Sequence, residues 1–141
     1  MVTSNGKCSC GKTRVTIHLP HALDQYSPRK CDCDFCVSKN IYYLSHPNGE
    51  LVIESKVPFE RQHQGSNQAD FITCSVCKTV IAAALQLENK LIGALNSTLL
   101  FDFSMLQKPT VVSPQMLSAK EKVERWKAVW LKIKIYENDH I

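Results

Sequence analysis

Short stretches of alternating or continuous apolar residues recur through most of the chain. Arg14 to Leu19 (RVTIHL) alternates polar and apolar positions, which is typical of a strand with one buried face. Turn-forming residues separate this stretch from further short runs rich in Ile, Val, Leu and Tyr. These runs are Ile41 to Leu44, Leu51 to Glu54, Ala69 to Thr73, Thr79 to Leu85 and Lys90 to Leu95. The pattern predicts a mainly β fold built on a small antiparallel sheet.

Two turn signals lie between these runs. The sequence Pro47-Asn48-Gly49 separates the second and third runs, and Glu88-Asn89 separates the last two. Proline, glycine and asparagine favour the backbone angles of tight turns. We therefore expect a turn at each place, with Glu88-Asn89 as a hairpin turn.

The pattern changes after about Thr98. Pro109 and Pro114 flank a short extended stretch, and Ser118-Ala119-Lys120-Glu121 has the form of a capping box. Apolar residues then follow at helical spacing: Val123, Trp126, Val129, Trp130 and Ile133. The sequence predicts a carboxy-terminal amphipathic helix whose tryptophans pack on the sheet. As an alternative, the tryptophans form a dimer contact or a substrate lid. The ending LKIKIY alternates like a strand, so the helix should end before it.

Length and composition indicate one globular domain over residues 1–141. The chain has 44% hydrophobic and 21% charged residues, which is ordinary for a soluble fold. Its longest apolar run, Val80 to Leu87, is far shorter than the roughly 20 residues that cross a bilayer. The amino-terminal sequence MVTSNGKCSC has no apolar stretch typical of a signal peptide. We expect a cytoplasmic protein without a membrane partner.

The charge balance does not favour nucleic acid as a partner. Lysine and arginine outnumber aspartate and glutamate by 17 to 13, a formal net charge of +4. However, thiolates on zinc would remove most of this excess, and the chain has no block of Lys and Arg of the kind that binds phosphate backbones.

The seven cysteines form three tight clusters. The clusters are Cys8 and Cys10 (CSC), Cys31, Cys33 and Cys36 (CDCDFC), and Cys74 and Cys77 (CSVC). An odd count without a secretion signal argues against a disulfide framework. Close cysteine pairs on turns can instead converge on one soft cation, and zinc is the default where ferredoxin spacings are missing.

Seven sulfur ligands divide most simply into four and three. Four thiolates close a structural zinc site, whereas three leave one position open for water or substrate. The middle cluster can supply three sulfurs from one loop, which leaves Cys8, Cys10, Cys74 and Cys77 for the closed site. A zinc ribbon of Cys33, Cys36, Cys74 and Cys77 is the alternative, and the spacing leaves both divisions open.

The order CSCGKT, CDCDFC and FITCSVC resembles the glutathione-dependent formaldehyde-activating enzyme family, which includes the centromere protein V type. The resemblance covers roughly Lys7 to Leu95. It implies a β-tent fold with two Zn²⁺ per chain, over a zinc-binding core of about residues 4–97 and an extension of about 98–141 that carries the helix. By position it implies a structural zinc on Cys8, Cys10, Cys74 and Cys77 and a catalytic zinc on Cys31, Cys33 and Cys36.

Three positions depart from the family pattern. Val37 stands where the family commonly has a basic residue, Lys78 where it has glycine, and Asp32 where it often has histidine. Zinc binding tolerates these changes, whereas glutathione recognition is more sensitive to them.

A zinc ion on three thiolates carries a net charge of −1, which makes it a poor Lewis acid and suits the exchange of sulfur ligands. This agrees with the activity that the resemblance implies, a carbon–sulfur lyase acting on a glutathione or other thiol adduct of a small aldehyde. Asp32 and Asp34 are candidate proton carriers; as an alternative, they are solvent-facing turn residues.

Other residues are weaker candidates. Cations for a glutathione carboxylate would come from Arg29, Lys30, Lys39 and Arg61. Tyr42 or Tyr43 could line a pocket, and no spacing singles out one histidine as a fourth zinc ligand among His18, His21, His46, His63 and His140.

The rival hypotheses are a non-enzymatic zinc-stabilised protein-binding module and a thiol redox sensor on Cys31, Cys33 and Cys36. A homodimer is left open.

Overall fold

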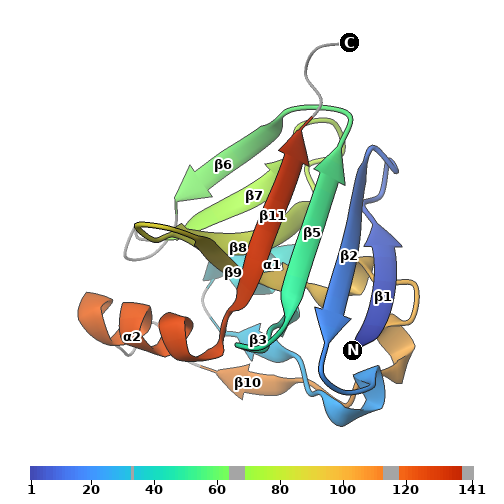
Figure 1. The fold of residues 1–141 in the computed structure, drawn as a ribbon. Coiled ribbons are helices and arrows are strands. Elements are labelled where there is room, and N and C mark those ends of the chain that lie inside the picture. The colour runs from blue at the N-terminus through green and yellow to red at the C-terminus, as the bar shows by residue number, and fades with distance from the viewer. Residues whose placement is uncertain (33, 64–68, 113–117, 138–141) are drawn as a thin grey trace.

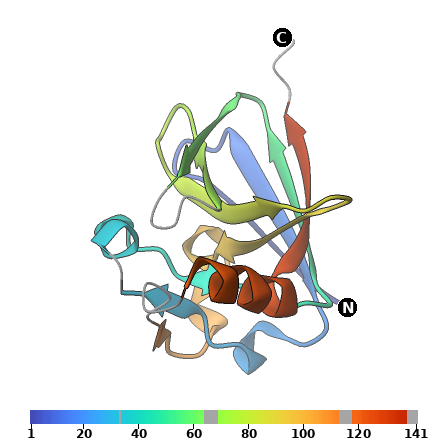
Figure 2. The same cartoon turned by 90° about the vertical axis from the view of Figure 1, so that its left-hand side faces the viewer.

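Two groups of strands meet at strand β9 (Figures 1 and 2). The computed structural model describes residues 1–32, 34–63, 69–112 and 118–137. The first group contains β1 (Val2–Lys7), β2 (Thr13–Leu19), β5 (Glu50–Ser55) and β11 (Leu131–Glu137). The second group contains β6 (Phe59–His63), β7 (Asp70–Cys74), β8 (Val80–Gln86) and β9 (Leu91–Asn96). The sheet continues from β9 through β4 (Tyr43–Leu44) and β3 (Arg29–Cys31) to β10 (Thr110–Val112).

The sheet is open, and most of its strand pairs are antiparallel. Two pairs are parallel, β5 with β11 and β3 with β10. In both, the second strand returns from the carboxy-terminal extension and lies beside a strand from much earlier in the chain. The extension is therefore part of the sheet, and a mainly β fold with a carboxy-terminal helix is confirmed.

The apolar runs predicted β2, β4, β5, β7, β8 and β9 to within two residues at each end. Both turns are also confirmed, because Gly49 N–H donates to the His46 carbonyl at 2.9 Å and Leu87 N–H donates to the Lys90 carbonyl at 2.8 Å. The pattern did not predict β1, β3, β6 or the short helix α1 (Asp34–Lys39). Strands β1 and β6 are edge strands with mixed polar sequences, so they lack a clear apolar face.

The carboxy-terminal helix α2 (Ala119–Val129) begins at the predicted capping box. Glu121 N–H donates to the Ser118 hydroxyl, and the Glu121 carboxylate accepts from Ser118 N–H. The helix ends at Val129, so Ile133, which the helical spacing had included, belongs to β11 and is buried there. The rings of Trp126 and Trp130 stack on each other, with centroids 4.6 Å apart.

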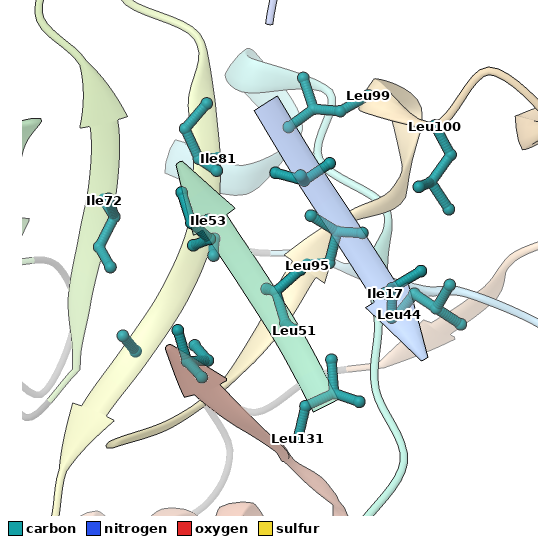
Figure 3. Close-up of a cluster of buried hydrophobic side chains, with 14 of the residues drawn as sticks. Ile17, Leu44, Leu51, Ile53, Ile72, Ile81, Leu95, Leu99, Leu100 and Leu131 are labelled. Atoms are coloured by element: carbon teal, nitrogen blue, oxygen red, sulfur yellow. The ribbon is translucent and has the colours of Figure 1, made fainter. Parts of the chain in front are cut away.

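The core lies between the two groups of strands (Figure 3). Ile17, Leu51 and Ile53 of the first group and Ile81 and Leu95 of the second are fully buried. Burial of a side chain of this size stabilises the fold by about 1.5–3 kcal/mol. Within the described residues, no helix has the length and apolar character needed to cross a lipid bilayer.

Candidate metal centre

Two hairpin loops of matching sequence carry the outer cysteine clusters. Residues 8–13 (CSCGKT) join β1 to β2, and residues 74–79 (CSVCKT) join β7 to β8. Each loop is closed in the same way, because the first cysteine donates its N–H to the carbonyl of the final threonine at 3.0 Å. The first loop extends from one group of strands and the second from the other, so a metal between them would join the two groups.

A left-handed residue turns each loop back on itself. Gly11 has φ +77° and donates its N–H to the Cys8 carbonyl at 3.0 Å. Lys78 has φ +62° and donates its N–H to the Cys74 carbonyl at 2.9 Å. The left-handed region of φ and ψ favours glycine, so glycine would fit position 78 with less backbone strain than lysine does. These turns bring the second cysteine of each loop near the first.

The four sulfurs have the spacing of a tetrahedral thiolate site. The Sγ atoms of Cys8, Cys10, Cys74 and Cys77 all lie within 4.8 Å of one another, and we call these residues the cysteine quartet. The Cys8 and Cys10 sulfurs are 3.5 Å apart, and those of Cys10 and Cys74 are 3.7 Å apart. A Zn–S bond of about 2.3 Å in a tetrahedron gives S···S separations of about 3.8 Å. The quartet therefore fits a soft divalent cation, and the chain carries a cysteine group that could hold a metal ion.

Burial and hydrogen bonds support thiolates at this place. Cys8 and Cys74 lie in the hydrophobic core cluster, whereas Cys10 is exposed. Thr13 N–H donates to Cys8 Sγ at 3.4 Å. The Thr79 hydroxyl lies 3.1 Å from Cys77 Sγ and 3.1 Å from the Ser9 hydroxyl of the other loop. Such donors stabilise negative charge on sulfur and orient the ligands.

Without a metal ion, the pKa of the Cys77 thiol is lowered and that of the Cys10 thiol is raised. Burial raises the pKa of the Cys77 thiol, but hydrogen bonds from the Thr79 hydroxyl and backbone and from within the quartet lower it to about 6. The Lys12 backbone lowers the pKa of Cys10, but desolvation and the neighbouring quartet thiols raise it to about 11. Cys77 is therefore mostly thiolate at neutral pH, which is the form that binds a cation.

The middle cluster lies on β3 and α1, away from the two loops in the sequence. Cys31 ends β3 and is buried, and Asp32 is half-buried with its N–H donated to the Val112 carbonyl at 3.0 Å. Cys36 is buried in α1, and its Sγ lies 3.0 Å from the Tyr43 hydroxyl. Cys33 and the side chain of Asp34 lie outside the described residues. The predicted catalytic zinc site thus stays a prediction.

The four candidate cations occupy different surroundings. Arg61 forms an ion pair with Glu137 at 2.9 Å, Lys30 lies 5.5 Å from the centroid of the Tyr42 ring, and Lys39 is exposed at the end of α1. Arg29 lines a pocket of about 240 Å³ together with Tyr43, one of the two candidate tyrosines. Burial, followed by the positive charge of Arg125, lowers the pKa of Arg29.

Sequence reasoning missed other parts of this pocket. Tyr26 and Val129 also line it, but they come from distant parts of the chain and share no local pattern with Arg29. His46, considered above only as a zinc ligand, is a lining residue too. His18 lies instead beside Thr3, with Nδ1 at 2.9 Å from the threonine hydroxyl.

The fold and the cysteine quartet define a mainly β domain with a candidate four-sulfur metal centre. No family model matches the chain, and no curated protein matches it either. Among solved structures, the chain is similar to a Rhodobacter sphaeroides protein, with 17% sequence identity and a TM-score of 0.58. The match covers 77% of this chain and 99% of that chain. At this identity the similarity shows a shared fold.

Proposed function

We propose that the chain is a zinc-dependent carbon–sulfur lyase-like enzyme that acts on a glutathione or other thiol adduct of a small aldehyde. One observation supports this proposal above the others. The quartet takes its four sulfurs from the first and last clusters, which leaves Cys31, Cys33 and Cys36 for a second ion with an open position. This is the division that the resemblance to the formaldehyde-activating family implies.

In this proposal the quartet has a structural role. Four thiolates with Zn²⁺ form a closed site, so no ligand position is left for a substrate. The bound ion would join the β1–β2 loop to the β7–β8 loop and so hold the two groups of strands together. A reducing cytoplasm suits this site, because thiols there stay available for metal.

The chemistry belongs to the middle cluster. When bound there, zinc supplies an electrophilic fourth position that accepts a thiolate sulfur. In the lyase direction, the hydroxyl proton of a thiol–aldehyde adduct passes to the carboxylate of Asp32 or Asp34. The C–S bond then breaks, its electron pair stays on sulfur as thiolate, and the carbonyl of the aldehyde forms. The aldehyde leaves without any change of oxidation state, so no further reactant is needed.

Zinc content and turnover test the proposal together. Wild-type protein purified without chelator should contain about two Zn²⁺ per chain, and Cys33→Ser should contain about one, because only the open site loses a ligand. This variant should stay folded, because the quartet keeps its ion, and should lose cleavage of the formaldehyde adduct of glutathione. Ser38→Ala in α1 is a matched control that should keep both zinc and turnover. Full turnover by Cys33→Ser would refute the catalytic assignment.

An exposed valine favours a second candidate function, a non-enzymatic zinc-stabilised protein-binding module. Val37 follows Cys36 directly and is 52% exposed, where the resembled family has a basic residue. An exposed apolar side chain at this place suits a protein surface better than an anionic thiol adduct. Two zinc ions per chain with no turnover of any thiol–aldehyde adduct would favour the module.

A further inference from the structure

A pocket of about 240 Å³ lies where the amino-terminal half of the chain meets the end of α2. The short helix η1 (Leu23–Gln25), β3 and β4 contribute to its lining, and Val129 contributes from α2. Tyr26, Tyr43 and Leu44 line it together with polar residues such as Gln25 and Ser45. Among the described residues that line the pocket, Arg29 is the cationic one and none is acidic. A positive group thus lines a cavity whose wall contains aromatic, apolar and uncharged polar residues.

Arg29 is half-buried, yet none of the ion pairs among the described residues includes it. Arg125 of α2 adds a second positive charge that acts on Arg29. Arg61, by contrast, forms an ion pair with Glu137. Because partial burial of an unpaired guanidinium costs free energy, an anion bound beside it would be stabilised.

Two further lining residues have hydrogen-bond donors to offer. Asn48 N–H donates to His46 Nδ1 at 3.1 Å, so the neutral imidazole carries its proton on Nε2. The Tyr26 hydroxyl oxygen accepts from His21 N–H at 3.1 Å, which leaves the hydroxyl hydrogen for another acceptor. Both residues line the pocket, so they are candidate neutral donors to an anion beside the guanidinium.

We propose that this pocket binds the carboxylate of a small organic acid, with Arg29 as its main cation and Arg125 as a second source of positive charge. A guanidinium matches a carboxylate through two parallel hydrogen bonds, and the aromatic walls suit an apolar body on the ligand. The inference goes beyond the proposed function, because carboxylate binding requires neither zinc nor turnover. Tyr43 connects the pocket to the middle cluster, since its hydroxyl lies 3.0 Å from Cys36 Sγ.

A titration of the full-length, zinc-loaded protein tests the pocket, with binding followed by NMR chemical shifts. The probe is 3-phenylpropionate, and its neutral analogue 3-phenylpropionamide has the same shape without the charge. We expect the acid to bind at least tenfold more tightly than the amide. Arg29→Gln should weaken binding of the acid at least tenfold, and Arg125→Gln should weaken it a few-fold. Arg14→Gln, an exposed arginine of β2, is the matched control and should change nothing.

Several results would overturn the proposal. Equal affinities for the acid and the amide would remove the role of the charge, and tighter binding of inorganic phosphate would contradict a carboxylate site. Val129→Phe should fill the pocket and abolish binding, which tests the location without changing Arg29; unchanged binding would refute it. Cys33→Ser should keep carboxylate binding even though it loses turnover, so failure of the pocket and failure of the lyase proposal are distinguishable.

Discussion

Cys10→Ser removes one ligand of the quartet without disturbing the hydrophobic core. The Cys10 side chain is exposed, whereas Cys8 and Cys74 are buried, so this substitution leaves no cavity. Its effect on stability should therefore come from the metal alone. We expect zinc-loaded wild-type protein to be much more stable than zinc-loaded Cys10→Ser, because the variant holds the ion with three sulfurs at most.

The largest effect, reached when the variant does not retain the ion, follows from the length of chain that the metal closes. Cys10 and Cys74 are 64 residues apart, and a cross-link of that span stabilises a fold by about 4 kcal/mol in the chain-entropy relation. Unfolding entropy scales with length, at about 0.3 kcal/mol/K for 141 residues, so the melting temperature should fall by about 13 °C. That loss is a large share of the total stability of a typical domain.

Thermal and urea unfolding, followed by circular dichroism under reducing conditions, measure this effect. The four samples are wild type and Cys10→Ser, each with zinc and with a chelator. The two proteins should differ only when zinc is present, and Val76→Ser, an exposed change in the second loop, should match wild type throughout. An equal difference in the presence of chelator would refute the metal-based reasoning, as would a wild-type protein that chelator does not destabilise.

Three further outcomes are expected. Calorimetry in buffers of different ionisation enthalpy counts the protons released when zinc binds. About one more proton should be released at pH 5 than at pH 7.5, because the Cys77 pKa of about 6 makes that thiol protonated only at the lower pH. Equal release at the two pH values would contradict the lowered pKa. Lys78→Gly should raise the free energy of unfolding in urea by roughly 0.5–1 kcal/mol through relief of the left-handed backbone, whereas Lys12→Gly, before the same threonine of the other loop, should lower it. Gly93→Ala should lower the melting temperature by several degrees or prevent folding, since the added Cβ would clash with the Ala83 carbonyl oxygen of β8. An unchanged melting temperature would contradict that close approach.

Local signals account for much of the fold. The alternation in RVTIHL predicted β2, and the Ser118 capping box predicted the start of α2, because both depend on residues close in sequence. The strands that the sequence did not reveal are short or lie at sheet edges, where burial imposes little pattern. The end of α2 was ambiguous because Ile133 fits both a helical and a strand period.

The sequence by itself determined that the cysteines are the candidate metal ligands of this protein. Seven cysteines in three clusters predicted metal binding, but the spacing allowed two divisions of the ligands. Only the tertiary structure gathered the quartet, because the contact between CSC and CSVC depends on how two hairpins from different groups of strands pack around one core. The same holds for the pocket, where Arg29 meets Val129 of α2 across most of the chain length. Such long-range contacts are fixed by packing of the whole sheet, and no local pattern encodes them.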